Sequence, residues 1–166
     1  MKLELDPDVL KNHQQKKSNS CIPMSVELLL KLNGNVKPTF FDIQDGNLGY
    51  KTYDGDGWEY KDKTIEGMKL HHLFEDKRGK YPIEKLFDKI REELDNKRFV
   101  QISLYNGKRN NGKDDNYHGW VVYGYEQNPD KFYGITFDHG NPNPVYKDTV
   151  FEELTKMKGT DILVYE

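Results

Sequence analysis

The most apolar stretch of the chain lies near its N-terminus, where residues 21–32 contain only three polar positions. A segment of this length that is apolar on nearly every side is typical of a buried helix. Ser20 is a good N-cap residue, Pro23 suits a first helical turn, and Gly34 is a plausible stop. The pattern therefore predicts a central helix that begins at Cys21, the only cysteine in 166 residues.

Two other segments have a helical pattern of apolar residues. Over residues 82–96 these residues recur at positions 0, 3, 4, 7 and 11, and the opposite face is charged, so we predict an amphipathic helix. Residues 64–75 have a weaker pattern of the same kind. A short helix is also expected around residues 150–157 near the C-terminus.

Short apolar or alternating runs predict the strands, at residues 99–104, 119–125, 132–137 and 162–165. Residues 105–117 are polar, with several asparagines and glycines, which indicates a loop.

The remaining segments are less regular. Residues 35–63 are rich in glycine and are expected to be irregular, with short strands around Phe40 and Tyr50. Residues 1–13 are expected to form an edge strand or an arm.

The order of these elements, with helices early and antiparallel strands late, is typical of an α+β fold. A chain of 166 residues and 19.5 kDa fits a single domain, residues 1–166, with a core of its own. Apolar residues make up 35% and charged residues 32%. The core must therefore come from a few dense segments.

Charge and cysteine content restrict the possible partners. The net charge of −3 and the pI near 6.0 give little support to nucleic-acid binding, which depends on neutralising phosphates. No apolar run approaches the roughly 18 residues of a membrane span, and the N-terminus lacks a signal-peptide pattern. We expect a cytoplasmic protein, or one exported without a cleaved signal. The sequence predicts no oligomeric state.

Two clusters suggest metal binding but do not match a metal site. The Asp54-Gly-Asp-Gly57 run resembles the start of a calcium loop, yet Trp58 and Ile65 stand where an EF-hand needs oxygen ligands. His71 and His72 are adjacent, so on a helix they would point about 100° apart. We expect neither a metal nor a cofactor.

Cys21 is the candidate nucleophile. At the first position of a helix, a thiol experiences the positive end of the helix dipole, which lowers its pKa from about 8.5 and favours the thiolate. Gln15 lies six positions earlier, close enough for its amide to join the Cys21 N–H in a two-donor oxyanion hole. Gln14 is an alternative donor. Taken alone, a single cysteine is more often a small buried hydrophobe.

His118 and Asp138 are the candidate partners of the thiol. His118 opens one predicted strand, and Asp138 closes the next one. In an antiparallel pair the first residue of one strand faces the last residue of its neighbour, so the carboxylate can orient the imidazole. We expect the Asp138 charge to raise the pKa of His118, which would give a thiolate and imidazolium pair.

The segments Gln15-x5-Cys21-x-Pro23, His118-Gly-Trp-Val-Val-Tyr-Gly-Tyr125 and Thr136-Phe-Asp138 together resemble papain-like cysteine peptidases. Within these enzymes the chain is similar to the compact bacterial group of double-glycine leader peptidases. The resemblance implies Cys21 as nucleophile, His118 as general base, Asp138 as orienting residue and Gln15 as oxyanion donor. It also implies a helix with the thiol packed against an antiparallel sheet that carries the histidine and the aspartate.

The chain departs from that group at two positions, because Ile22 and Met24 replace the usual glycine and small residue. A branched side chain at residue 22 leaves less room for a substrate backbone. From the resemblance, the first interpretation is a cysteine peptidase or amide hydrolase that acts on a protein or peptide. The alternatives are a glutamine deamidase or transamidase effector with the same triad, and a catalytically silent module that binds peptides.

Overall fold

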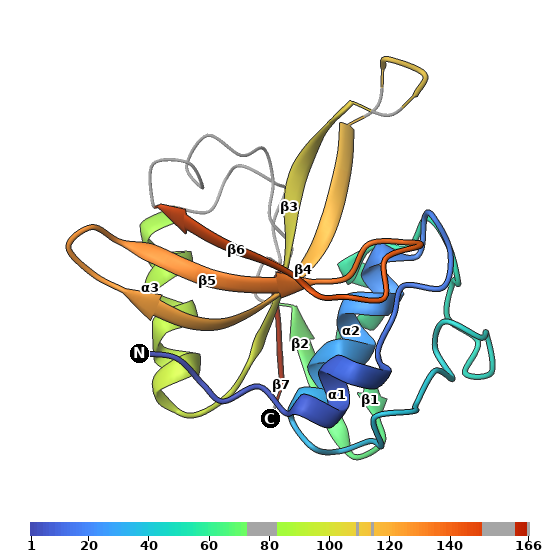
Figure 1. Cartoon of the computed structure of the whole chain (residues 1–166), viewed down its shortest axis with the longest axis horizontal. Helices are drawn as coiled ribbons and strands as arrows, with labels where there is room; N and C mark the ends of the chain where they lie inside the picture. The colour runs from blue at the N-terminus through green and yellow to red at the C-terminus, as the bar shows by residue number, and fades with distance from the viewer. Residues whose placement is uncertain (73–82, 109, 114, 151–161, 166) are drawn as a thin grey trace.

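A computed structural model of the chain describes residues 1–72, 83–108, 110–113, 115–150 and 162–165, with an antiparallel sheet at its centre (Figure 1). In these residues the strand order is β1-β2-β7-β3-β4-β5-β6, and each paired neighbour is antiparallel. The α+β class predicted from the element order is thus confirmed. The strands are Thr64–Ile65 (β1), Met68–His72 (β2), Val100–Lys108 (β3), Asp115–Glu126 (β4), Lys131–Thr136 (β5), Val145–Val150 (β6) and Ile162–Tyr165 (β7). The helices are Pro7–Asn12 (α1), Cys21–Leu32 (α2), the 3₁₀ helix Gly57–Tyr60 (η1) and Ile83–Asp95 (α3).

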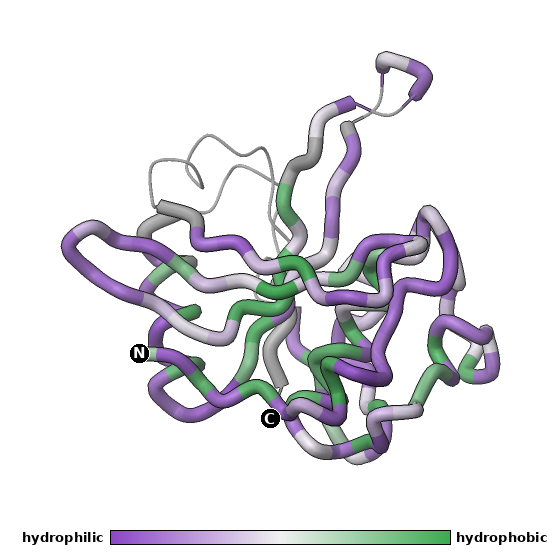
Figure 2. Tube along the Cα trace, in the orientation of Figure 1, coloured by the Kyte–Doolittle hydropathy of each residue, from purple (hydrophilic) through white to green (hydrophobic). Residues whose placement is uncertain are grey.

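The sheet separates two hydrophobic cores. Val121 of β4 packs into the core around α2, and the next residue, Val122, packs into the core around α3. This alternation follows from strand geometry, in which successive side chains point to opposite faces. Figure 1 shows α1 and α2 on one side of the molecule and α3 on the other. Apolar positions are concentrated along α2 and the centre of the sheet (Figure 2).

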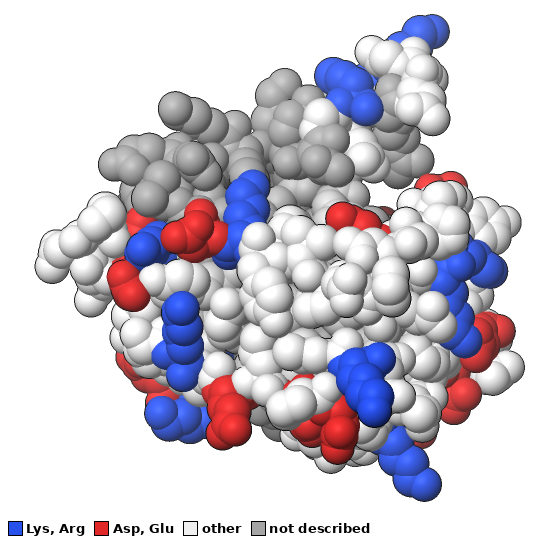
Figure 3. Space-filling model, viewed as in Figure 1, with Lys and Arg blue, Asp and Glu red and all other residues white. Residues whose placement is uncertain are grey.

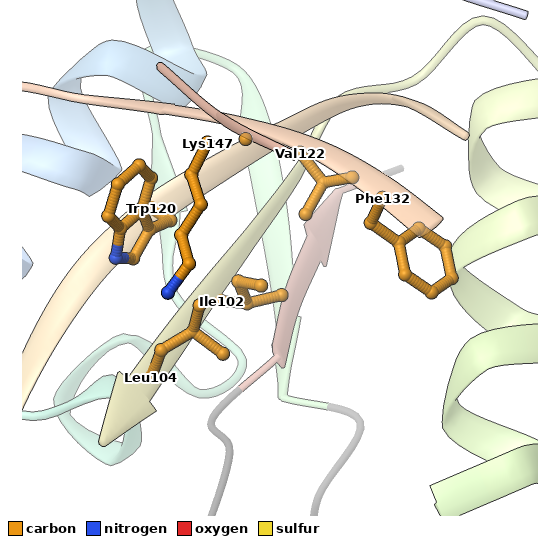
Figure 4. Close-up of a pocket in the computed structure, with 7 residues that line it drawn as sticks. Ile102, Leu104, Trp120, Val122, Phe132 and Lys147 are labelled. Atoms are coloured by element: carbon orange, nitrogen blue, oxygen red, sulfur yellow. The ribbon is translucent and has the colours of Figure 1, made fainter. Parts of the chain in front are cut away.

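A small apolar pocket lies on the α3 face of the sheet (Figure 4). Trp120 and Leu104 form part of its wall, and the long side chain of Lys147 runs across it. The Lys147 Nζ atom lies 6.0 Å from the centre of the Trp120 ring, at the limit of a cation–π contact. The centre of the Trp120 ring also lies 5.9 Å from that of His118, so one wall of this pocket contacts the candidate base.

The two main helix predictions are confirmed. The buried segment forms α2 with the bounds expected, and its residues from Ile22 to Lys31 are buried. The amphipathic pattern over residues 82–96 becomes α3, Ile83–Asp95. No helix in the described part of the chain is long and apolar enough to cross a membrane.

The helix predicted over residues 64–75 is wrong. Thr64–Ile65 and Met68–His72 form a hairpin instead, in which Ile65 pairs with Met68. Glu66 and Gly67 make the turn, and both have positive φ, as a two-residue hairpin turn requires. Met68, Leu70 and His72 are buried in alternation with more exposed residues, as expected for a strand with one face toward the core. Residues 73–75 lie outside the described residues.

The loop predicted over residues 105–117 is also wrong in large part. β3 continues to Lys108 and β4 begins at Asp115, so the two strands extend as a hairpin beyond the rest of the sheet (Figure 1). Its tip is hydrophilic (Figure 2), which explains why the sequence resembles a loop. As a consequence, His118 lies inside β4 instead of opening the strand.

The predictions for the chain ends and the glycine-rich segment are mixed. The N-terminus is an arm whose Leu3 N–H donates to Tyr123 O at 2.7 Å, and α1 follows it. In residues 35–63 the short strands are absent, and η1 is the regular element. β6 was not predicted, whereas β7 was. The helix expected at residues 150–157 falls outside the described residues, apart from Val150 at the end of β6.

Candidate active site

Helix α2 places Cys21 at the edge of β4. Cys21 is the first residue of α2, so its N–H lies at the end of the helix where N–H groups lack partners within the helix. Its thiol donates a hydrogen bond to the carbonyl oxygen of Tyr117, with an S···O distance of 3.4 Å. Tyr117 directly precedes His118, so the sulfur lies against the part of β4 that carries the candidate base.

A glycine permits this close approach of helix and strand. A Cβ atom at Gly119 would lie 2.6 Å from Cys21 O and 2.8 Å from Ser25 Cβ, and it would also overlap with Ser25 Oγ. Real Cβ atoms essentially never come so close to a backbone atom. The absent side chain of Gly119 therefore lets the first turn of α2 rest directly on the backbone of β4.

The imidazole of His118 is held by two side chains from β5 and the loop that follows it. Thr136 Oγ1 lies 2.6 Å from Gly119 O and 2.9 Å from His118 Nε2, and Asp138 Oδ1 lies 3.2 Å from the same nitrogen. The carbonyl of Gly119 can only accept, so the Thr136 hydroxyl donates its proton there and accepts from His118 Nε2–H. The proton of a neutral ring is therefore on Nε2, and Nδ1 is left as the acceptor.

Burial determines the direction of the His118 pKa shift. The side chain is 16% exposed, and burial lowers the pKa of His118 below its usual value, while the Asp138 charge acts in the opposite direction. The Asp138 charge thus acts on the pKa in the expected direction, but burial of the ring outweighs it and disfavours the expected imidazolium. The site thus favours a neutral imidazole, which is the form that can accept a proton.

Gln15, and not Gln14, faces the candidate site. Gln15 is 4% exposed and lines the same cleft as Cys21, whereas Gln14 is exposed. The Gln15 side chain donates from Nε2 to Lys17 O at 2.7 Å, which fixes the orientation of its amide. Its Oε1 atom is buried and has no hydrogen-bond partner among the described residues.

Ser20 occupies the N-cap position, but its hydroxyl does not cap α2 as expected. The hydroxyl instead accepts from Lys17 N at 3.1 Å and lies 3.0 Å from Lys17 O and 3.1 Å from Gln44 Oε1, both of which can accept its proton. Gln15 and Ser20 therefore both bind the carbonyl of Lys17. These bonds close the segment between them into a compact loop in front of Cys21.

The candidate residues share one cleft of about 820 Å³, which is open to solvent. Gln15, Cys21, Ile22, His118 and Asp138 all line it. Ile22 therefore borders the space beside the sulfur, as its position after Cys21 suggested. Met24, the other departure from the papain-like pattern, is fully buried in the core and does not line the cleft.

The polar residues of α2 are buried behind this cleft. Glu27 is fully buried, and its Oε2 accepts the backbone N–H groups of Ile43 at 3.1 Å and Gln44 at 3.2 Å. Burial raises the pKa of Glu27 to about 7. The carboxylate thus fastens the loop around residue 44 to the helix that carries Cys21.

Lys31, one turn further along α2, has its own buried partner. Its Nζ donates to His13 Nδ1 at 2.8 Å, and His13 Nε2 donates to Met24 O at 3.0 Å, so the His13 ring is neutral. Burial lowers the pKa of Lys31 to about 8 and, together with the charge of Lys31, lowers that of His13 well below its usual value. These bonds attach the end of α1 to α2.

Sequence reasoning missed three residues that shape the site: Gly119, Thr136 and Gln44. Thr136 stands two positions before Asp138, and this spacing on one strand face was an available signal. Gln44 lies in an irregular segment without a periodic pattern, so no signal in the sequence indicated it.

Among the described residues, neither the surface charge seen in Figure 3 nor the grouping of metal-ligating side chains indicates a nucleic-acid or metal site. Basic and acidic side chains are interspersed over the face seen in Figure 3, so its described residues form no continuous field of one sign. In the described ranges, no three His, Cys, Asp or Glu side chains are placed to hold one metal ion. Compared with protein-family models and with curated proteins, the chain matches none.

Proposed function

We propose that this chain is a cysteine-dependent amide hydrolase, in the simplest case a peptidase, that works like the papain-like enzymes its sequence resembles. One observation carries the proposal. The thiol of Cys21 lies against the backbone beside His118, whose Nε2 proton is held by Thr136 and Asp138 so that Nδ1 is available as a base. A nucleophile, a base and an orienting group for the base are the parts that nucleophilic catalysis requires.

The proposed reaction begins with transfer of the Cys21 thiol proton to His118 Nδ1. The sulfur then attacks the substrate carbonyl carbon, and the carbonyl oxygen takes up the electron pair. When this tetrahedral species collapses, the C–N bond breaks and the imidazolium gives its proton to the leaving amine, which leaves an acyl-thioester on Cys21. Water, deprotonated by His118, hydrolyses the thioester and releases the acid product together with the free thiol.

Gln15 and the backbone of Cys21 are the proposed oxyanion donors. The Cys21 N–H is at the helix terminus, where the helix dipole also favours negative charge. The Gln15 amide uses one of its two N–H bonds for Lys17 O, and the other can bind the oxyanion. Burying an amide oxygen without a partner costs about 1 to 3 kcal/mol, so Gln15 is a poor choice for stability alone.

The test combines a thiol probe with peptide hydrolysis. We expect iodoacetamide to alkylate Cys21 at pH 7 much faster than it alkylates the same chain unfolded in denaturant. Wild type should cleave members of a fluorogenic peptide library, and both Cys21→Ala and His118→Ala should abolish cleavage while a melting curve shows that they remain folded. Equal alkylation rates in the folded and unfolded chain would refute an activated thiol.

A glutamine deamidase or transamidase is the second candidate, because both reactions also pass through an acyl-thioester. The specific observation in its favour is Ile22, whose branched side chain borders the cleft beside the sulfur. A branched residue at this position leaves less room for a peptide backbone than glycine would, and a slim side-chain carboxamide needs less room. Release of ammonia from glutamine-containing proteins, without cleavage of the library, would favour this candidate over the peptidase.

A further inference from the structure

We propose that Gln44 is a positioning residue that holds the two oxyanion donors, Gln15 and the N–H of Cys21, at a fixed separation. This inference deepens the proposed hydrolase function and rests on it. Gln44 is 1% exposed and is not among the residues that line the cleft. Any effect it has on catalysis must therefore be transmitted through the residues that it binds.

The side-chain amide of Gln44 makes hydrogen bonds to the backbone on both sides of Gln15. Its Nε2 donates to the carbonyl of Gln14 at 2.9 Å, and its Oε1 accepts from the N–H of Lys16 at 2.8 Å. A planar amide that binds the groups before and after one residue restrains the φ and ψ angles of that residue, much as a neighbouring β-strand would. The backbone from which the Gln15 side chain projects is therefore fixed by Gln44.

The same amide oxygen reaches the other donor. Gln44 Oε1 also lies 3.1 Å from the hydroxyl of Ser20, the residue directly before Cys21. The Ser20 hydroxyl accepts from Lys17 N–H, and its single proton is shared between Gln44 Oε1 and Lys17 O, the carbonyl that accepts the Gln15 amide. One side chain thus joins the segment that carries Gln15 to the residue that precedes the Cys21 N–H.

Gln44 is itself fixed to the helix that carries the thiol. Its backbone N–H donates to Glu27 Oε2 at 3.2 Å, and Ile43 donates to the same oxygen. Glu27 lies six residues after Cys21 on α2. The chain of bonds from α2 through residue 44 to residues 14–16 and 20 is closed, so α2 and the Gln15 segment are held as one unit.

The test replaces Gln44 by methionine, which has a similar volume but cannot make these hydrogen bonds. We expect Gln44→Met to lower kcat about 10²-fold, the typical effect of losing an oxyanion donor, with KM and the pH profile little changed. Iodoacetamide alkylation of Cys21 forms no oxyanion and should stay within about twofold of wild type. Ser20→Ala removes one of the three side-chain links and should lower kcat by about tenfold. It also serves as the test if Gln44→Met fails to fold.

Gln101→Met is the matched control. Gln101 is also a fully buried glutamine, but its Nε2 donates to Ser25 and to groups of β3, and it makes no hydrogen bond to residues 14–20. We expect Gln101→Met to leave kcat within about threefold of wild type. A kcat for Gln44→Met within twofold of wild type would overturn the proposal, and so would alkylation that falls in parallel with kcat.

A second measurement separates this inference from the proposed function. In ¹⁵N-labelled protein, the Gln15 side-chain N–H that binds Lys17 O should resonate at a lower field than the same proton in the unfolded chain. Gln44→Met should shift or broaden this signal, and Gln101→Met should not. If wild type hydrolyses no substrate, the proposed function fails, while unchanged Gln15 signals in Gln44→Met refute the positioning role.

Discussion

Replacing Gly119 with alanine should separate the thiol from its base. The new Cβ would lie 2.6 Å from the carbonyl oxygen of Cys21, whereas ordinary contact begins at 3.4 Å. A backbone carbonyl inside the first turn of a helix cannot rotate away, and the Ser25 side chain blocks the neighbouring space. The N-terminal turn of α2 must therefore move about 0.8 Å away from β4 to restore ordinary contact.

Such a displacement acts on catalysis more than on stability. A misplacement near 1 Å can cost about 10²-fold in rate, so we expect kcat to fall by about that factor and the alkylation rate of Cys21 by about tenfold. Overpacking of this kind typically costs about 1 to 3 kcal/mol of unfolding free energy. Denaturant unfolding, iodoacetamide alkylation at pH 7 and peptide hydrolysis would be measured on the same preparations.

Gly124 provides the matched control on the same strand. A Cβ there would lie 2.6 Å from the carbonyl oxygen of Met1, an equally severe overlap with the N-terminal arm. We expect Gly124→Ala to lose a similar amount of stability but to keep the thiol reactivity of wild type. If Gly119→Ala keeps its alkylation rate within twofold of wild type, or if both variants lose it equally, the reasoning is refuted.

Three further predictions concern protons. Thr136→Val removes the acceptor for His118 Nε2–H, and we expect kcat to fall about tenfold, with recovery in Thr136→Ser; an unaffected Thr136→Val would remove the hydroxyl from the site. Burial lowers the pKa of His118 and the Asp138 charge raises it, so Asp138→Asn should lower this pKa further. The acid limb of the pH–rate profile should then move to lower pH. An acid limb that stays in place or moves to higher pH would contradict this prediction. Glu27 has a pKa of about 7 when folded and its ordinary value of 4.5 when unfolded, so the stabilisation from its protonated form is complete below pH 4.5 and disappears as the pH rises through 7. Relative to Glu27→Gln, wild type should lose roughly 3 kcal/mol of unfolding free energy over this interval, as denaturant titrations at several pH values would show. A stability difference between the two that stays constant with pH would refute the shift.

The parts of the fold that follow from local periodicity were predictable. The continuous apolar run of α2 and the regular spacing of α3 are properties of short segments, and burial of those faces fixes the helices. The β1–β2 hairpin was missed because its apolar residues also fit a helical count. The Glu66-Gly67 turn was the deciding feature, and its meaning depends on backbone angles that the sequence only suggests.

Some residues of the candidate site could likewise be predicted from the sequence, and others could not. Cys21, His118 and Asp138 could be proposed because each belongs to a chemically distinctive residue type near the end of an apolar segment. In the sequence, Thr136 is an ordinary strand residue. Its role becomes visible only in the fold, where its hydroxyl bonds to the Gly119 carbonyl and to the His118 imidazole. Burial of His118, which reverses the expected direction of its pKa shift, comes from the packing of the complete sheet and helix.

The contact between Cys21 and Tyr117 joins residues 96 positions apart in the chain. Contacts of this separation form late in folding, because a long loop must close before they contribute any stabilisation. During synthesis, α2 and its thiol emerge long before β4 and β5 supply the histidine, the threonine and the aspartate. An incomplete or unfolded chain therefore carries an ordinary thiol of low reactivity. The rise in the alkylation rate of Cys21 during refolding should report when the final folding steps are complete.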